Sequence, residues 1–535
     1  MTAADVALPR TIGVVGAGTM GAGIAQLACV MGAQTLLHDP EHAALERGAA
    51  QVATGLDRLV TRGRLDQDAR DAALARVEPA PRLEDLAPCD LIIEAAPERL
   101  DVKAEIFGRL SREIARPNCV IASNTSSIPI TAIAATAEHP ERVVGMHFFN
   151  PAPVMKLVEV IAAIQTSGEA LQLAQATGEA MGKRVIIATD GPGFLVNRCG
   201  RPFGLEALRA LQEQLADVET IDRIVRLGGG FRMGPFELQD LVGIDTGFAV
   251  AQSFAELSFG EPRWRPSPLS AQLVAAGRLG RKSGRGWYSY ADGTVHRPAD
   301  AAVPAHPGGG GRLVTIAGDF ALADALRDLA AQSGWDARDP EDAAGELPFL
   351  IVDAGGPSAE EPSQGGPQAL LCAEGSLAEL DQGGSATGFH ALPPLQRGGL
   401  VELTRSYGTS DLSAARSGEF FGSLGLHTAW VGDAPGLVLG RLVAQLVNEA
   451  AFAIGEGVGT ADDIDAGMML GLNHPRGPLA WGDEIGLDHV LAILDALLAE
   501  RGDPAYRAAP SLRRLVAEGR VGEATGAGFH AHSHA

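Results

Sequence analysis

The chain repeats itself, and this repeat constrains its architecture more than any other feature of the sequence. Gly-Met-His147 is followed after twelve residues by Glu159, and Gly-Phe-His390 is followed after twelve residues by Glu402. The interval of 243 residues between the two histidines also matches further pairs without a gap: Asp190 with Asp433, Arg198 with Arg441, Glu206 with Glu449, Asp222 with Asp465, and Gly243 with Gly486. Such agreement indicates a duplication. The 535 residues are therefore expected to form two tandem copies and not several unrelated domains.

Each copy is predicted to have two parts. In the first copy, TIGVV from Thr11 predicts a strand, the residues after Gly21 predict a helix, and residues 35–38 predict a second strand, which together open a βαβ unit. Further apolar runs predict a mostly parallel sheet up to about Asp190: LIIEA, VIASN, RVVGMHFF, KLVEVI and RVIIA. Residues 191–279 have helical apolar spacing. Residues 291–311, rich in Pro and Gly, predict a flexible linker between the copies.

A glycine-rich loop follows the first predicted strand. Gly16 allows a tight turn, Gly18 lets a pyrophosphate approach the backbone, and Gly21 permits close packing of the next helix, whose N-terminus offers amide donors to phosphate. Asp39 ends the second strand, where a carboxylate accepts hydrogen bonds from both ribose hydroxyls and repels a 2′-phosphate. A glycine turn without a ligand would not explain Asp39. The pattern predicts that NAD binds here in preference to NADP.

This loop defines the fold class. We expect an α/β Rossmann-type domain followed by an all-α helical domain, with the pair duplicated and the second copy degenerate. The expected boundaries are residues 1–190 for the NAD-binding domain, 191–290 for the helical domain, 291–311 for the linker, 312–432 for the degenerate Rossmann-like domain and 433–535 for the second helical domain.

A histidine and a glutamate form the second chemical pattern. His147 ends an apolar strand and Glu159 lies in the next one, so neighbouring strands would bring the two side chains together. A carboxylate on one ring nitrogen fixes the tautomer while the other nitrogen accepts a proton, as in general base catalysis. A core histidine bonded to a buried glutamate would show the same spacing. The position downstream of a dinucleotide site favours catalysis.

Composition excludes several function classes. The 43 Lys and Arg residues against 66 Asp and Glu give a net charge of −23, which disfavours nucleic acids and anionic membranes as partners. No apolar run reaches the length of a membrane span, and the N-terminus does not have the pattern of a signal peptide. The five cysteines are far apart, which disfavours disulfides and structural zinc. A cytoplasmic protein is expected.

The sequence resembles the L-3-hydroxyacyl-CoA dehydrogenases of fatty acid β-oxidation and related acid degradation. The resemblance covers about residues 8–290 and rests on six segments in the family's order: GVVGAGTMGAGIAQ, SNTSS, GMHFFNPAPVMKLVEVI, DGPGFLVNR, GGGFRMGPFELQDLVGID and GRKSGRGWYSY. It implies reversible oxidation of an L-3-hydroxyacyl-CoA to the 3-ketoacyl-CoA, with hydride transfer to NAD.

The resemblance also implies roles for single residues. His147 matches the catalytic base and Glu159 the carboxylate that orients it, while Ser126 and Asn197 match the groups that bind the reacting oxygens of the substrate. Five positions match contacts to NAD: Glu98, Lys103, Ser126, Asn150 and Lys282. For Lys103 a solvated helix face is the alternative.

The CoA phosphates require positive charge that the composition as a whole does not supply. Residues 41–79 read as a helical hairpin that, by the resemblance, covers CoA. It carries four arginines that would provide local positive potential, although they would also suit an ordinary charged surface: Arg47, Arg58, Arg62 and Arg64.

The second copy has lost the ligand-binding motifs. Ala317-Gly-Asp319-Phe320 replaces the glycine loop, and Asp319 would repel phosphate. The hairpin is missing after Asp339-Pro340, Gly440 stands in place of Asn197 and Ala524 in place of Lys282. His390 and Glu402 keep their spacing, but we expect this copy to be catalytically silent. Its helices are expected to cover the face by which single-copy relatives pair, so that the two helical domains associate within one chain; a homo-oligomer is the alternative.

Three further expectations concern ligands. His530, His532 and His534 read as a solvated tail, and no metal is assigned. Tandem chains of this length resemble dehydrogenases of 3-hydroxyadipyl-CoA, for whose distal carboxylate Arg198, Arg201 and Arg232 are candidates, but 3-hydroxybutyryl-CoA fits equally. The alternative functions are a dehydrogenase of free 3-hydroxy acids and a non-enzymatic protein that binds NAD or acyl-CoA.

Overall fold

The computed structural model describes residues 6–291, 295–356 and 366–532. The chain divides into two compact units, and the division does not follow the five expected ranges. The first unit comprises Met1–Arg198 together with Gly457–Leu472, and the second comprises Cys199–Glu456 together with Asn473–Ala535. A short segment of the second half of the chain thus belongs to the same unit as the predicted NAD-binding domain. No helix in the described ranges is both long and apolar enough to cross a membrane.

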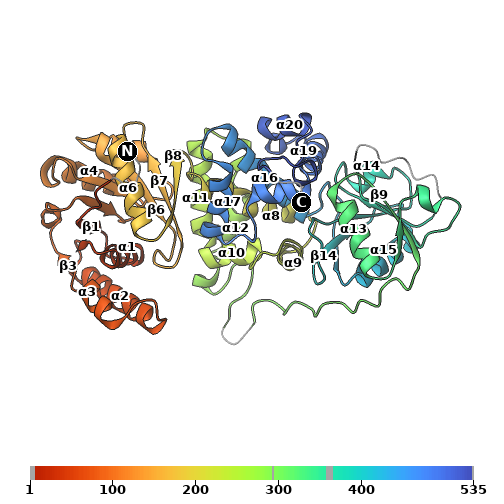
Figure 1. Ribbon diagram of the computed structural model, residues 1–535, viewed down its shortest axis with the longest axis horizontal. Helices are drawn as coiled ribbons and strands as arrows, with labels where there is room; N and C mark the ends of the chain where they lie inside the picture. The colour runs from red at the N-terminus through yellow and green to blue at the C-terminus, as the bar shows by residue number, and fades with distance from the viewer. Residues whose placement is uncertain (1–5, 292–294, 357–365, 533–535) are drawn as a thin grey trace. The chain divides into compact units, whose positions relative to one another are not determined.

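The first unit is built on one eight-stranded sheet with the order β3-β2-β1-β4-β5-β6-β7-β8 (Figure 1). All neighbours are parallel except β6 and β7. The strands match the predicted apolar runs: β1 (Thr11–Val15), β2 (Gln34–His38), β4 (Leu91–Glu94), β5 (Val120–Ser123), β6 (Val143–Phe148), β7 (Leu157–Ala162) and β8 (Arg184–Thr189). Helices α1 (Thr19–Val30), α4 (Leu100–Arg109), α5 (Ile130–Ala134) and α6 (Gly168–Ala180) belong to the same unit. Both faces of a parallel sheet of this kind are covered, which explains why the central strands β4, β5 and β6 are buried along their whole length.

The predicted helical hairpin is present as α2 (His42–Thr61) and α3 (Gln67–Leu74). The expected hairpin range was too long, because its last residues begin β3 (Val77–Ala80), which pairs with β2 at the sheet edge. This strand was not predicted, because Pro79 interrupts the apolar pattern of a strand. Proline cannot donate to a strand ladder, and an edge strand is the place in a sheet that tolerates it.

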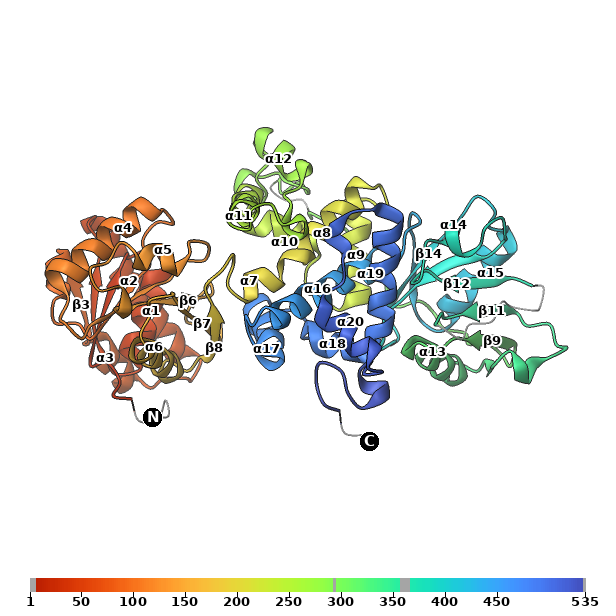
Figure 2. The ribbon, with the colours of Figure 1, turned by 90° about the horizontal axis from the view of Figure 1, so that it is seen from above.

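The second unit contains helices from both halves of the chain. The first half supplies α8 (Arg201–Gln212), α9 (Val218–Gly229), α10 (Pro235–Val242), α11 (Ile244–Leu257) and α12 (Pro268–Ala275). The second half supplies α16 (Leu439–Gly455), α18 (Pro478–Ile485), α19 (Leu487–Arg501) and α20 (Pro510–Ala517). Helix α16 is buried along nearly its whole length, because α8, α18, α19 and α20 all pack against it (Figure 2).

The second unit also holds a seven-stranded sheet with the order β10-β9-β11-β12-β13-β14-β15. Its strands are β9 (Leu313–Ala317), β10 (Asp336–Arg338), β11 (Leu350–Asp353), β12 (Gln368–Leu371), β13 (Thr387–His390), β14 (Leu400–Thr404) and β15 (His427–Trp430). This is the order of the first sheet without its β3 edge, and β13 and β14 are again the antiparallel pair. The helical hairpin is replaced by a single short turn, Glu341–Ala343, as the sequence predicted.

The linker and the tail are more ordered than expected. Residues 295–311 have no regular secondary structure, but His296 lies 2.7 Å from Glu237 and Arg226 lies 2.7 Å from Asp300, so a hydrogen bond and an ion pair hold the segment along the helices. The solvated tail is wrong for residues 530–532, because the amide of His530 and the ring of His532 both bond to the Asp483 carboxylate. His534 lies outside the described residues.

Candidate active site

His147 and Glu159 form a buried pair in the first unit. The antiparallel register of β6 and β7 places them opposite each other, and Nδ1 of His147 lies 2.7 Å from a carboxylate oxygen of Glu159. The rings of Phe149 and Phe194 pack on the imidazole at centroid distances of 4.5 and 5.8 Å. With the carboxylate accepting the Nδ1 proton, Nε2 has its lone pair available, and it makes no hydrogen bond to any described residue.

Glu159 also holds the segment that carries Asn197. Its other oxygen accepts hydrogen bonds from the backbone amides of Leu195 and Val196, at 3.0 and 2.9 Å. These amides lie at the start of the short helix α7 (Val196–Cys199). One fully buried carboxylate therefore fixes both the imidazole and the Asn197 backbone. The Asn197 side chain is partly exposed and bonds to none of the described side chains, which leaves its amide available to a ligand.

The Ser126 loop is organised by Glu98. One oxygen of Glu98 accepts hydrogen bonds from the Thr125 hydroxyl at 2.6 Å and from the amides of Ser126 and Ser127 at 2.9 and 3.0 Å. Burial opposes ionisation of this carboxyl, but the Lys103 charge and these hydrogen bonds outweigh it and lower the pKa of Glu98. The Ser126 hydroxyl itself is only 3.4 Å from Glu98 and is half-buried, so it remains able to donate to a substrate oxygen.

Lys103 does not lie on a solvated face, and that alternative is wrong. The side chain is 1% exposed, and its ammonium is 2.6 Å from Glu94 and 3.4 Å from Glu98. Ser123 donates to the second oxygen of Glu94 at 2.6 Å, which completes a buried polar cluster at the ends of β4 and β5. The sequence pattern of α4 did not reveal this burial, because the partners come from two other segments. Lys103 supports Glu98 through charge.

The glycine loop has the shape that a dinucleotide requires. Gly16 has φ of +98°, and a Cβ there would lie 2.6 Å from the Ala95 carbonyl; a Cβ on Gly21 would lie 1.7 Å from the Gly16 carbonyl. Protein packing therefore demands both glycines. A Cβ on Gly18 would meet no atom within 4 Å, so Gly18 instead keeps open the space in front of α1. Asp39 stabilises the loop by accepting from the Ala17 amide at 2.9 Å, and its carboxylate is half-buried. The residues present thus fit NAD.

Two predicted cofactor contacts lie further away along the chain. Asn150 is exposed and lies two residues beyond Phe148, where β6 ends. Lys282 belongs to the second unit, where its exposed ammonium lies 2.5 Å from Asp245. That hydrogen bond lowers the pKa of Asp245. Contact of either residue with NAD stays a prediction.

The candidate anion-binding arginines differ in their surroundings. All four hairpin arginines are exposed; Arg47 lies 3.6 Å from Glu41, and the other three make no ion pair with the described residues. Arg232 is also exposed, whereas Arg198 is buried. Arg201 is unusual, because its Nε is buried without a hydrogen bond, its guanidinium lies 5.1 Å from the centre of the Phe254 ring, and no described carboxylate pairs with it. Burial lowers the pKa of Arg201 to about 10.

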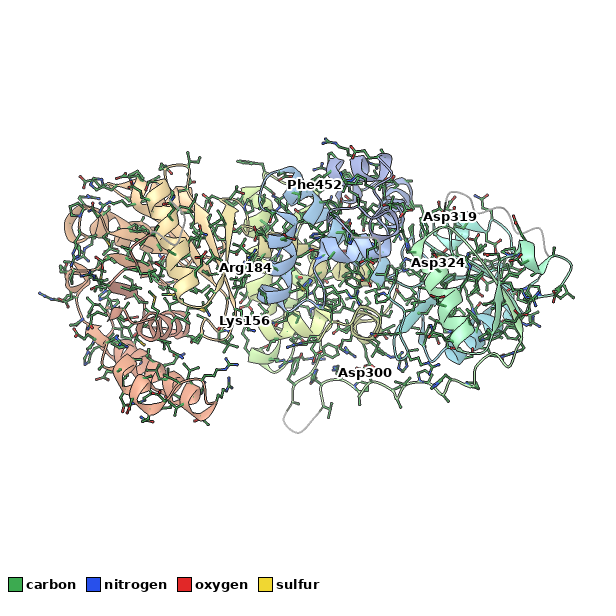
Figure 3. The ribbon with its side chains drawn as sticks, in the orientation of Figure 1. Lys156, Arg184, Asp300, Asp319, Asp324 and Phe452 are labelled. Atoms are coloured by element: carbon green, nitrogen blue, oxygen red, sulfur yellow. The ribbon has the colours of Figure 1, made fainter. Side chains whose placement is uncertain are left out.

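The corresponding positions in the second half of the chain are occupied by aromatic side chains. Phe320 is the N-cap of α13 (Ala321–Gln332), as Gly18 is of α1, and its ring stacks on His489 at 4.6 Å. His489 in turn lies 3.3 Å from His390, whose ring occupies the space that a side chain on Gly440 would need. Asp319, labelled in Figure 3, stands beside Phe320 in this loop. In the second half, Phe320 thus stands where Gly18 keeps the space in front of α1 open in the first.

The second His/Glu pair keeps its register but not its hydrogen bond. His390 and Glu402 face each other across β13 and β14, yet both oxygens of Glu402 accept from backbone amides, those of Val438 and Leu439 at 2.8 and 3.0 Å. Burial raises the pKa of Glu402 to about 8 and lowers that of His390 well below its usual value. The sequence did not reveal His489, because it lies 99 residues beyond its partner.

Comparison with known proteins agrees with this geometry. The family profile described as "3-hydroxyacyl-CoA dehydrogenase, NAD binding domain" matches residues 11–191, and "3-hydroxyacyl-CoA dehydrogenase, C-terminal domain" matches twice, at 193–290 and 436–532. The chain is 36% identical to 3-hydroxyadipyl-CoA dehydrogenase of Escherichia coli over 94% of its own length and 97% of that protein. It is 42% identical to a probable 3-hydroxybutyryl-CoA dehydrogenase of Deinococcus radiodurans over 52% of this chain and 99% of the relative.

A solved structure shares the whole architecture. The crystal structure of 3-hydroxybutyryl-CoA dehydrogenase from Escherichia coli K12 superposes with a TM-score of 0.80 at 34% identity, covering 96% of this chain and all of the other. Fold, loop and dyad together define an NAD-dependent oxidoreductase with a Rossmann domain followed by a helical domain. The chain belongs to the 3-hydroxyacyl-CoA dehydrogenase family.

Proposed function

We propose that the protein oxidises an L-3-hydroxyacyl-CoA to the 3-ketoacyl-CoA with His147 as the general base. The observation that carries this proposal is the buried His147–Glu159 pair with a free Nε2. His147 Nε2 takes the proton of the 3-hydroxyl, and Glu159 stabilises the resulting imidazolium. Ser126 and Asn197 donate hydrogen bonds to the substrate's oxygens. NAD, when bound, accepts the hydride from C3; Gly16, Gly18, Gly21 and Asp39 would hold it.

The test is the rate of NADH formation in His147→Ala. We expect kcat to fall by about 10²–10⁴-fold, the usual contribution of a general base, while the Kd for NAD stays unchanged. A rate within threefold of the parent would favour a protein that only binds NAD or acyl-CoA. Comparison of 3-hydroxybutyryl-CoA with free 3-hydroxybutyrate tests the second alternative, because a dehydrogenase of free acids would turn over the free acid, whereas the proposed enzyme requires the CoA thioester.

We also propose that the second half is a degenerate copy that no longer binds NAD. The shared strand order supports this, and so do repeated contacts: Asp190 accepts from the amides of Ile130 and Thr131, as Asp433 does from Leu377 and Ala378. We retain 1–190, 191–290, 291–311, 312–432 and 433–535 as the ranges inherited from the duplication.

Pairing of the two helical domains within one chain is the proposed role of the duplication. It is supported by Arg441, which is fully buried and lies 2.6 Å from Glu206 on α8 and 2.7 Å from Glu213. Truncation after about residue 291 should expose this apolar and charged face and cause aggregation or new dimerisation. A stable, fully active truncated monomer would contradict the proposal.

For the substrate we propose an acyl chain that ends in a second carboxylate. The support is Arg201, which pairs with no described carboxylate and whose Nε is buried without a hydrogen bond, an arrangement that is costly without an anion. Arg201→Met should lower kcat/KM for 3-hydroxyadipyl-CoA at least tenfold and leave that for 3-hydroxybutyryl-CoA within twofold. Equal losses on both substrates would refute this assignment.

A further inference from the structure

A helix from the second half of the chain packs against the candidate active site. Helix α17 (Ala461–Leu472) belongs to the first unit and contacts β7. A Cβ on Gly471 would lie 3.0 Å from Leu157, 3.1 Å from Val196 and 3.3 Å from Phe149. The contact is closer still at Gly467, where a Cβ would lie 2.8 Å from Val196. The two glycines, one helical turn apart, let the helix approach so closely that an added side chain would displace Val196 or its neighbours.

The residues that α17 contacts are those that hold the catalytic groups in place. Val196 donates its amide to Glu159 and directly precedes Asn197, and Phe149 packs on the His147 ring. Figure 2 shows α17 beside α7, and Arg184, labelled in Figure 3, ties the start of α17 to β8 through a 2.7 Å ion pair with Asp463. A shift of α17 would therefore move the imidazole support and the Asn197 backbone together.

The first copy makes the same contact with the second, where no chemistry remains. Gly228 of α9 is the counterpart of Gly471, and a Cβ there would lie 2.9 Å from Leu439 and 3.3 Å from the Leu400 carbonyl. Leu439 and Leu400 occupy the positions of Val196 and Leu157 in the repeat. The chain thus contains two equivalent helix contacts, one beneath the intact dyad and one beneath the filled site.

We propose that α17 is a positioning element for catalysis, supplied to the active copy by the silent one. Gly467 and Gly471 are positioning residues, because they act through Val196 and Phe149 and touch no substrate. This inference rests on the proposed function, since it presumes that His147 and Asn197 carry the reaction. It gives the second copy a role in the chemistry that is separate from covering an apolar face.

The matched glycines provide the experiment. Gly471→Val and Gly228→Val introduce the same side chain at equivalent helix positions of the full-length protein. Displacement of α7 by about 1 Å would cost up to about 10²-fold in rate. We expect Gly471→Val to lower kcat by 10- to 100-fold with the Kd for NAD within twofold of the parent, and Gly228→Val to leave kcat within twofold. Gly471→Ala, which adds only the Cβ, should give an intermediate kcat.

Three results would overturn the inference or its basis. A parental kcat in Gly471→Val, or equal losses of kcat in the two valine variants, would show that α17 does not position the site. The value of kcat is calculated from the concentration of protein that binds NAD, and Tm is measured for both variants. Loss of folded protein is thereby distinguished from loss of activity. Failure of the proposed function appears elsewhere, as a parent protein that does not reduce NAD with a 3-hydroxyacyl-CoA.

Discussion

Exchange of Glu159 for glutamine separates its catalytic task from its structural one. The carboxylate accepts three hydrogen bonds, from His147 Nδ1 and from the amides of Leu195 and Val196. In Glu159→Gln the amide oxygen can keep the two backbone donors, so the NH2 group must face His147. In the reverse orientation the glutamine NH2 would face the backbone amides of Leu195 and Val196, which are also donors. Both buried amides would then lack an acceptor, at a cost of about 1–3 kcal/mol each.

The glutamine NH2 then requires a lone pair on Nδ1, which moves the ring proton to Nε2. The imidazole in that tautomer cannot accept the proton of the 3-hydroxyl. An analogous carboxylate-to-amide change in serine proteases lowers kcat about 10⁴-fold through the wrong tautomer, equivalent to about 5.5 kcal/mol of barrier. We expect a loss of 10³–10⁴-fold here. The cost in stability should be only about 1 kcal/mol, because a charge-assisted hydrogen bond becomes a neutral one.

The assay is NADH formation at saturating substrate together with urea unfolding. Glu402→Gln is the matched control, since Glu402 accepts two backbone amides but has no histidine partner. Its kcat should stay within twofold of the parent. If Glu159→Gln retained a tenth of the parental kcat, the tautomer argument would fail; if it lost several kcal/mol of stability, the assumed orientation of the amide would be wrong.

Three further outcomes follow from the described contacts. Gly18→Phe should raise the Kd for NAD at least 100-fold by calorimetry, about 2.7 kcal/mol, with little change in Tm, because space at this position is open. Arg441→Met should lower the free energy of unfolding by about 3–5 kcal/mol in urea by leaving Glu206 short of a buried partner, whereas the exposed Arg405→Met should leave it unchanged. The pKa of Glu402 is raised to about 8 in the folded protein, so between pH 4.5 and 8 this carboxyl ionises in the unfolded chain but stays protonated in the folded one. The free energy of unfolding of the parent should therefore fall relative to that of Glu402→Gln as pH rises across this range.

Local patterns predicted most of the first unit. The glycine spacing located the loop, and the apolar runs located every strand except β3, whose proline interrupts the pattern. The His147–Glu159 pair was also accessible from the sequence, because two strands that follow each other along the chain, joined here by residues 149–156, commonly pair as neighbours in a sheet. These features depend on neighbours that are close along the chain.

Contacts between distant segments escaped prediction. Lys103 has helical surface spacing, and only its ion pair with Glu94 across the strand ends shows that it is buried. The interval between His390 and Glu402 is visible in the sequence. It does not show that His489 contacts His390 or that backbone amides occupy the Glu402 carboxylate. The placement of α17 with the first unit could not be predicted, because Gly467 and Gly471 are visible in the sequence but the residues they contact, such as Val196 and Leu157, lie more than 270 positions earlier.

The buried contacts between the two halves are not identical, although the repeat in the sequence places them at equivalent positions. Beside Glu206 stands Tyr506, whose hydroxyl lies 3.1 Å away, whereas the equivalent position beside Glu449 is Arg263, at 2.7 Å. The Arg263 guanidinium also lies 3.9 Å from the ring centre of Phe452, labelled in Figure 3. In an assembly of identical chains any replacement appears on both sides of the symmetry axis. A fused pair is free of that constraint, so each side can acquire its own chemistry one substitution at a time.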